Sequence, residues 1–365
     1  MNRHRHTSRI AGSVAILTVW LSAGCPKSET PPPTSTAQLT APSTDPDEAR
    51  LAIFKPALPA EFLNPANAFS EDKVALGRML YYDKRLSKNH DVSCNSCHDL
   101  ITFGVDGKRV SIGHKKQTGS RNSPTVYNAA GHFTQFWDGR AKDVEEQAMG
   151  PVLNPVEMAI PAPAQVEACL QSIPQYVDLF KKVYPGDAQP VTLAHAASAI
   201  AAFERRLVTP SRWDKYLGGD KSALTDVEKA GLNKFMKVGC PTCHLGTLMG
   251  GAMFQKAGLV KAWPNMTDKG RGVITKNSVD EMFFKVPSLR NVEKTAPYFH
   301  DGSVEKLEDA VRQMARHQLG QELTDPDIGS IVAFLKTLTG TIPVDYIKMP
   351  EMFPNSPKTP KPDPS

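Results

Sequence analysis

Apolar residues recur at helical spacing in several stretches of this 365-residue chain. Two of these stretches open with Ser70 and Thr225, and both residue types are preferred caps at the start of a helix. The apolar face consists of Ala75, Leu76, Met79 and Leu80 in the first stretch and of Ala230, Leu232 and Phe235 in the second. No long run alternates apolar with polar residues as a half-buried β-strand would, although short hairpins remain an option. The pattern predicts a mainly α-helical protein.

The two helices share features that indicate a weak duplication. Gly77 precedes Tyr81 by four residues, as Gly231 precedes Phe235. Two later apolar runs also resemble each other, residues 199–203 (AIAAF) and 330–334 (SIVAF). A small residue at a helix crossing allows two helix backbones to approach closely. We therefore expect two similar helical units, in each of which the first and last helices cross.

Each unit contains one C-x-x-C-H motif. The motifs are Cys94, Cys97 and His98, and Cys240, Cys243 and His244. Two thiols at this spacing can each add to a vinyl group of one porphyrin, and the following histidine can bind the iron. A thioredoxin-like pair, half a zinc site or a disulfide would explain one C-x-x-C, but not two copies each followed by histidine. The motifs predict two covalently bound haem c groups in two cytochrome c-like domains in tandem, residues 51–215 and 216–345.

The N-terminal sequence has the features of an export signal. Residues 1–25 carry three arginines and then an apolar run, residues 10–21, that is too short to span a bilayer comfortably. The ending LSAGC resembles a lipoprotein box with Cys25 as the lipidated residue, and ordinary cleavage nearby is the alternative. Residues 26–50, rich in Pro, Ser and Thr, predict a flexible tether. We expect a periplasmic protein that Cys25 can anchor to a membrane.

Three other sequence features add to this picture. Without the three signal arginines the formal charge falls from +5 to +2 (40 basic against 38 acidic residues), which gives no indication of a nucleic-acid partner. Cys169 belongs to no motif and is expected to be a buried, small apolar residue. The Pro-rich tail, residues 346–365, is expected to lie over the surface or to be disordered.

The second axial ligand of each iron separates electron transfer from catalysis, because only an open iron can bind a small oxidant. His114 follows a glycine in a segment that could swing, and a surface-loop histidine is the alternative. Met314 lies on the apolar face of a predicted helix, where it is either a ligand or a core residue. Spacing cannot rank four further histidines, His132, His195, His300 and His317.

Several motifs resemble the bacterial di-haem cytochrome c peroxidase family. They are residues 121–128 (RNSPTVYN), 135–140 (QFWDGR), 146–148 (EQA), 154–158 (NPVEM), 286–292 (VPSLRNV) and 295–302 (TAPYFHDG). The similarity extends from residue 51 to residue 345. It implies a cytochrome-c peroxidase that reduces hydrogen peroxide with electrons from a small c-type cytochrome or a cupredoxin, and that forms a homodimer.

The resemblance also implies a division of labour between the haems. The N-terminal haem, bound by His98, would be peroxidatic, with His114 as a sixth ligand that leaves when the other haem is reduced. The C-terminal haem, bound by His244 and Met314, would receive electrons, since Met ligation raises the reduction potential. Trp137 matches the family tryptophan between the haems, and a packing ring is the alternative.

Peroxide cleavage requires a base that takes a proton from one oxygen and returns it to the other. The acidic residues near the motifs are Asp138, Glu145, Glu146 and Glu157, and the residues alone do not choose among them. The resemblance selects Glu157, with Gln147 as a polar neighbour that orients peroxide. It also assigns an inter-domain Ca²⁺ to oxygen atoms of Asn122, Thr295 and Pro297.

Three other functions fit part of the sequence. A di-haem electron-transfer cytochrome would keep both irons six-coordinate. A relative that oxidises tryptophans during quinone-cofactor maturation would have tyrosine as the distal ligand of the C-terminal haem, and Met314 argues against this function. A haem sensor would need an output domain, for which the sequence gives no indication.

Overall fold

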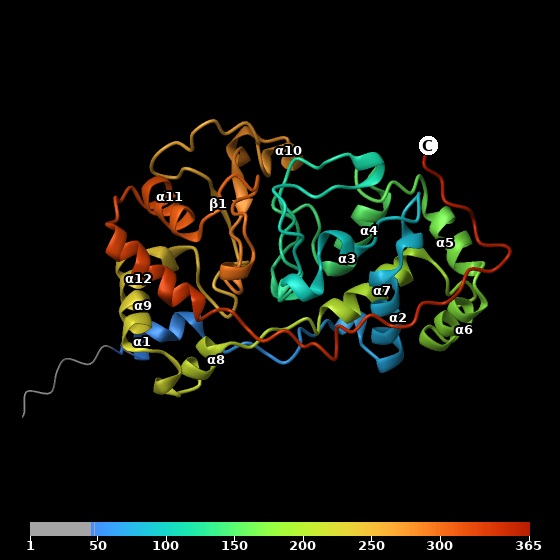
Figure 1. Cartoon of the computed structure of the whole chain (residues 1–365), viewed down its shortest axis with the longest axis horizontal. Coiled ribbons are helices and arrows are strands. Elements are labelled where there is room, and N and C mark those ends of the chain that lie inside the picture. The colour runs from blue at the N-terminus through green and yellow to red at the C-terminus, as the bar shows by residue number, and fades with distance from the viewer. Residues whose placement is uncertain (1–44, 47) are drawn as a thin grey trace, which may run out of the picture. The chain divides into compact units, whose positions relative to one another are not determined.

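The computed structural model describes residues 45, 46 and 48–365 of the chain (Figure 1). The predicted signal, the lipidation site Cys25 and most of the predicted tether lie outside the described residues. The last three residues of the range predicted as tether belong to the first helix. The α-helices of the described part are α1 (Glu48–Leu51), α2 (Glu71–Tyr82), α3 (Cys94–Cys97), α4 (Val144–Leu153), α5 (Pro163–Gln171), α6 (Pro174–Val183), α7 (Leu193–Glu204), α8 (Arg212–Leu217), α9 (Asp226–Val238), α10 (Gly272–Thr275), α11 (Leu307–Leu319) and α12 (Asp325–Lys336).

Strands make up little of the described chain. β1 (Phe254–Lys256) and β2 (Phe283–Lys285) pair antiparallel, with Phe254 opposite Lys285. Short 3₁₀ helices and long irregular segments connect the helices. The prediction of a mainly helical protein with at most short hairpins is confirmed for the described residues.

The predicted crossing in the N-terminal half is present between α2 and α7. The Ser70 hydroxyl accepts a hydrogen bond from the Lys73 amide and so caps α2, as the sequence predicts. A Cβ atom at Gly77 would lie 1.8 Å from the carbonyl oxygen of Ala199. The helices can therefore touch only because this position carries no side chain.

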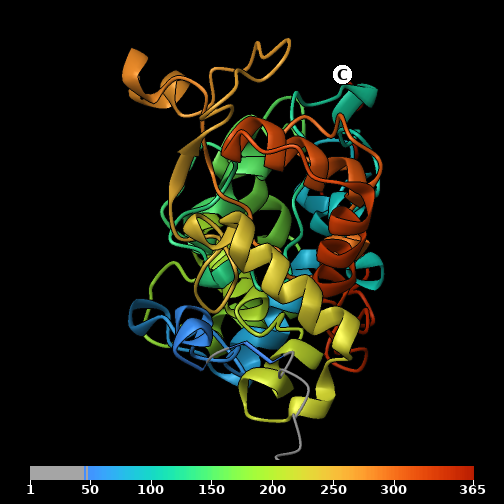
Figure 2. The ribbon, with the colours of Figure 1, turned by 90° about the vertical axis from the view of Figure 1, so that its left-hand side faces the viewer.

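The C-terminal half repeats this crossing with α9 and α12, which Figure 2 shows on the side turned to the viewer. The Thr225 hydroxyl accepts from the Glu228 amide, and the Glu228 carboxylate accepts from the Thr225 amide. This reciprocal capping box fixes the start of α9. A Cβ atom at Gly231 would lie 1.9 Å from the Ser330 carbonyl oxygen, so the second crossing also depends on a glycine.

The buried apolar residues form two clusters. The first joins α2 to α4, α5, α6 and α7. Cys169 of α5 is buried, as predicted, and burial raises the pKa of its thiol to about 11. The second joins α8, α9, α11 and α12. The chain passes between the clusters near both described ends, because Leu51 and Phe54 pack in the second cluster and Ile347 in the first.

The C-terminal segment lies along the first cluster, as the red trace in Figure 1 shows. Phe353 packs edge-to-face on Tyr176 at 5.0 Å between ring centroids. Arg85 donates to the Phe353 carbonyl and to the Asn355 side chain, both at 2.9 Å. Among the described residues, no helix is long and apolar enough to cross a membrane.

Candidate functional site

The first C-x-x-C-H motif opens into a cavity of about 640 Å³ in the N-terminal half. Cys94 and Cys97 are the end residues of α3, and both line this cavity together with His98. The Tyr81 hydroxyl of α2 donates to the His98 carbonyl at 2.7 Å. The aromatic residue that follows Gly77 by four positions thus ties the crossing helices to the motif.

The first cavity has the donor set that a c-type haem requires. Burial lowers the pKa of His98, so the imidazole is neutral and has a lone pair for a metal. The Nδ1 atom of His98 is buried and has no hydrogen-bond partner among the described residues. The two thiols, one histidine and a cavity on one side of them fit a covalently attached haem.

The structure separates the four acidic candidates that the sequence left open. Asp138 is paired with Arg121 at 2.6 Å and with Arg140 at 3.1 Å. Glu145 is paired with Arg205 at 2.7 Å, and its pKa is lowered to about 2 against the effect of burial. The lowered pKa makes Glu145 a poor proton acceptor, and the two arginines occupy the Asp138 carboxylate.

Of the other two acids, Glu146 turns back to accept a hydrogen bond from the Lys142 amide at 2.8 Å at the start of α4 and does not line the cavity. Glu157 does line it and forms no salt bridge with a described residue. Burial raises the pKa of Glu157, opposed by the charge of Arg140 and by Asn154. The Asn154 amide donates to Oε1 at 2.6 Å, which leaves Oε2 for another partner.

Gln147 also lines the first cavity, from α4, which Asp143 caps. Glu157 and Gln147 thus both line the cavity of the first motif, and their catalytic roles stay predictions. An acid with a raised pKa can accept and return a proton, and an amide side chain in the same cavity can bind a polar substrate.

His114 does not line this cavity. Its ring is buried, and Nε2 donates to the Ser365 carbonyl at 3.2 Å. The backbone of the loop is strained, because the consecutive residues Lys115 and Lys116 have φ angles of 55° and 58°. The structure thus holds His114 on the C-terminal segment, and its predicted role as a sixth ligand stays a prediction.

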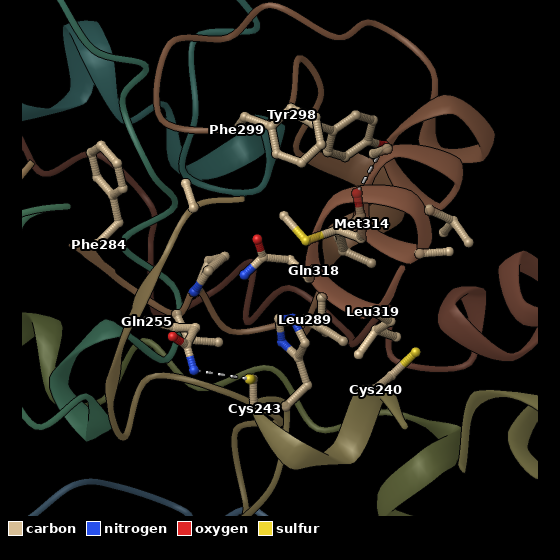
Figure 3. A pocket seen from close by; sticks show the side chains of 18 of the residues that line it. Cys240, Cys243, Gln255, Phe284, Leu289, Tyr298, Phe299, Met314, Gln318 and Leu319 are labelled. Carbon is tan, nitrogen blue, oxygen red and sulfur yellow. Dashed lines mark hydrogen bonds between the residues drawn. The ribbon is translucent and has the colours of Figure 1, made fainter. Parts of the chain in front are cut away.

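The second motif lies beside a cavity in the C-terminal half (Figure 3). His244 and Met314 both line it, and Figure 3 shows the Met314 sulfur directed into the space above Cys243. The His244 Nδ1 atom donates to the Met249 carbonyl at 3.2 Å, which leaves Nε2 free to bind a metal. Burial lowers the His244 pKa to about 4. These residues fit a second haem with one histidine and one methionine side chain facing it.

Trp137 lines both cavities. Its indole nitrogen donates to the Asn122 carbonyl at 2.9 Å, and its own carbonyl accepts from the Lys285 amide at 2.7 Å. The ring and the main chain of Trp137 are therefore each held by a hydrogen bond, and its place between the haems stays a prediction.

One of the predicted calcium residues, Asn122, is bonded to the segment that holds the other two. The Asn122 amide donates to the His300 carbonyl at 2.8 Å, which brings it to the segment that contains Thr295 and Pro297. No group of three or more His, Cys, Asp or Glu side chains suited to a metal is present in the described residues. A calcium site here would use neutral oxygen atoms, and it stays a prediction.

The sequence did not single out Arg121 and Lys285, which both line the first cavity. Arg121 bridges Asp138 and Asp268, the latter at 2.7 Å, and so joins segments far apart in the chain. Arg121 is the first residue of the family motif 121–128, and Lys285 directly precedes the motif 286–292. This proximity to the motifs is the sequence signal that could have identified them.

The sequence and the fold have relatives among known proteins. The family model for the di-haem cytochrome c peroxidase matches residues 71–222. The chain is 47% identical to the cytochrome c551 peroxidase of Nitrosomonas europaea over 86% of this chain and 92% of that protein. It is 46% identical to the cytochrome c551 peroxidase of Pseudomonas aeruginosa over 84% and 90%.

A solved structure of a MauG-like protein associated with microbial copper homeostasis superimposes with a TM-score of 0.70, at 29% identity, over 85% of this chain and 98% of that one. The helical fold and the two C-x-x-C-H cavities define a haem-binding oxidoreductase. The similarities show further that the chain belongs to the di-haem cytochrome c peroxidase family, whose activity is that of a cytochrome-c peroxidase.

Proposed function

We propose that this peroxidase divides its reaction between two haem domains in tandem. Cys94, Cys97 and His98 would hold a haem that supplies the chemistry of hydrogen peroxide reduction to water. Cys240, Cys243 and His244 would hold a haem that takes up electrons from a small c-type cytochrome or a cupredoxin. The observation that carries the proposal is that Glu157 and Gln147 line the cavity of His98, while Met314 lines the cavity of His244. A haem bound by His98 supplies an iron that binds peroxide and exchanges electrons.

The residues of the first cavity supply proton transfer. Two electrons and two protons convert one peroxide molecule into two water molecules. Glu157, as a carboxylate, takes a proton from the peroxide oxygen nearer the haem and gives it to the departing oxygen. Asn154 keeps Oε1 occupied, so that Oε2 faces the substrate, and the Gln147 amide orients the peroxide.

A steady-state assay tests this function. Peroxide consumption is measured with a reduced cytochrome as donor, with and without prior reduction of the enzyme. Electron paramagnetic resonance of the half-reduced protein reports the ligands of each haem. An N-terminal haem that stays low-spin and ignores peroxide at every redox level would instead support an electron-transfer cytochrome.

We expect His114 to control the need for prior reduction. Its loop carries strained backbone angles, and strain of this kind is common in segments with two states. His114→Gly should therefore be active without prior reduction, whereas the wild type gains activity after it. A Lys116→Ala variant, which changes a side chain of the same loop but keeps the imidazole and the strained backbone, is the control and should behave as the wild type. Equal dependence on reduction in wild type and His114→Gly would exclude the switch.

We expect Met314 to be the sixth ligand of the C-terminal haem. Met314→Leu should lower the reduction potential of that haem and open its iron to added ligands, because a thioether ligand favours the reduced state. Met266→Leu is a matched control, since Met266 lines the same cavity. Redox titration followed by absorption measures both. A shift in the Met266 variant alone would assign the ligand to Met266.

The remaining assignments are also proposals. The export-type sequence of residues 1–25 and covalent haem attachment support a periplasmic location, with Cys25 as a lipid anchor. Mass spectrometry of the mature N-terminus tests both. Asn122, Thr295 and Pro297 are proposed to bind Ca²⁺, which chelation followed by assay tests, and a homodimer is tested by light scattering.

A further inference from the structure

Lys285, at the end of β2, is a buried cation without a carboxylate partner. Its side chain belongs to a residue that is only 6% exposed, and it forms no salt bridge with a described residue. Nζ donates to His132 Nδ1 and to the Thr134 carbonyl, each at 3.0 Å. A buried ammonium held only by neutral acceptors is costly, which indicates that a further anion belongs beside it.

The hydrogen bonds around Lys285 leave two donors unused. An ammonium carries three protons, and the two acceptors above take two of them. Because His132 Nδ1 accepts, the proton of that ring is on Nε2, which is buried without a partner among the described residues. The imidazole N–H points away from the ammonium, because the two ring nitrogens face different directions. The free ammonium donor is therefore the group that suits a carboxylate, which has several acceptor positions.

The position of Lys285 connects it to both haem cavities. Lys285 and Trp137 line both of them. The nearest carboxylate that acts on its charge is Asp138, which Arg121 and Arg140 already neutralise. Asp268 binds Arg121 and faces His300, and Arg271 donates to the Asp138 main-chain carbonyl, so none of these groups forms an ion pair with Lys285. Burial lowers the Lys285 pKa to about 7, and a neighbouring anion would keep the group charged.

We propose that Lys285 is a counter-ion shared by the two haem pockets. His132 and Thr134 position its ammonium, which would pair with haem propionate carboxylates. Its charge would thereby set the reduction potentials of the two haems, between which an electron passes near Trp137. In this step the C-terminal haem is oxidised and the N-terminal haem is reduced by the same electron, and Lys285 transfers no proton. Lys285 is a positioning residue, since its charge acts on the irons from a distance.

The test compares the holoprotein with Lys285→Met, Lys285→Arg and the control Lys181→Met, which removes an exposed lysine on α6. Each haem is titrated against potential by absorption, and inter-haem electron transfer is timed after rapid reduction. Loss of the buried charge should make reduction of at least one haem about tenfold less favourable, or about 59 mV for one electron. Lys285→Arg should restore wild-type potentials, and Lys181→Met should leave them unchanged.

Wild-type potentials for both haems in a Lys285→Met protein that holds two haems would overturn the proposal. Should that variant fail to mature, Lys285→Gln replaces it, and unchanged potentials there overturn the proposal equally. If Lys285→Met and Lys285→Gln both fail to take up haem but Lys285→Arg matures, the result supports the proposal, because only the arginine variant keeps the positive charge. Failure of all three shows a packing role and overturns it.

This inference rests on the proposed division between two haems. The titration uses no peroxide, so unchanged potentials in an active peroxidase reject only the role of Lys285. Shifted potentials in a protein without peroxidase activity reject only the proposed function.

Discussion

Glu157→Gln should reduce peroxide turnover by a factor of about 10² or more while both haem spectra stay intact. The substitution keeps the shape of the side chain but removes the group that accepts a proton. Glu157 is the acid of the four candidates that lines the first cavity free of ion pairs. Steady-state assay after full reduction of the enzyme measures the effect separately from the switch that we propose for His114.

Glu146→Gln is the matched control for this variant. Glu146 precedes Gln147 on α4. Its carboxylate accepts a hydrogen bond from the Lys142 amide, and the residue does not line the cavity. We expect near-normal turnover in this control. Turnover of Glu157→Gln equal to that of the control would remove Glu157 from catalysis.

The pH profile gives an independent measure of the same group. A base acts only when deprotonated, so wild-type kcat/KM should fall as the pH drops through the Glu157 pKa. Because burial raises this pKa, the fall should begin above the pH at which an exposed glutamate is protonated. Glu157→Gln should lack this acidic limb.

Gly231→Ala should lower the free energy of unfolding by about 3 kcal/mol, at the upper end of the cost of overpacking a core. The added methyl group would lie 1.9 Å from the Ser330 carbonyl oxygen, which belongs to the α12 backbone and cannot rotate away. The helices α9 and α12 must therefore separate. Denaturant unfolding of the holoprotein, followed by circular dichroism, measures the loss.

Gly329→Ala is the matched control, because Gly329 lies in α12 and a Cβ there meets no atom within 4 Å. Alanine favours a helix over glycine by up to about 1 kcal/mol, so this variant should be slightly more stable than the wild type. The two identical substitutions should thus have opposite signs. Equal stability of the variants would show that the crossing tolerates a side chain.

The local features of the fold could be predicted from the sequence. Ser70 and Thr225 cap their helices as predicted, because a side-chain oxygen satisfies an amide that the first helical turn leaves free. Gly77 and Gly231 marked the crossings, because only a position without a side chain admits a second backbone. The two C-x-x-C-H motifs could also be read directly, since haem attachment depends on spacing within five residues.

What the sequence determined by itself is the chemistry available: two haem attachment sites, four acids near them, and a methionine and several histidines as further ligands. The tertiary structure decided which of these meet. Asp138 and Glu145 form ion pairs with Arg121 and Arg205, whereas Glu157 is buried at the cavity without such a partner. Lys285 gained its place between the cavities only through folding, because the charge, burial and neighbours that define such a site come from segments distant in the chain.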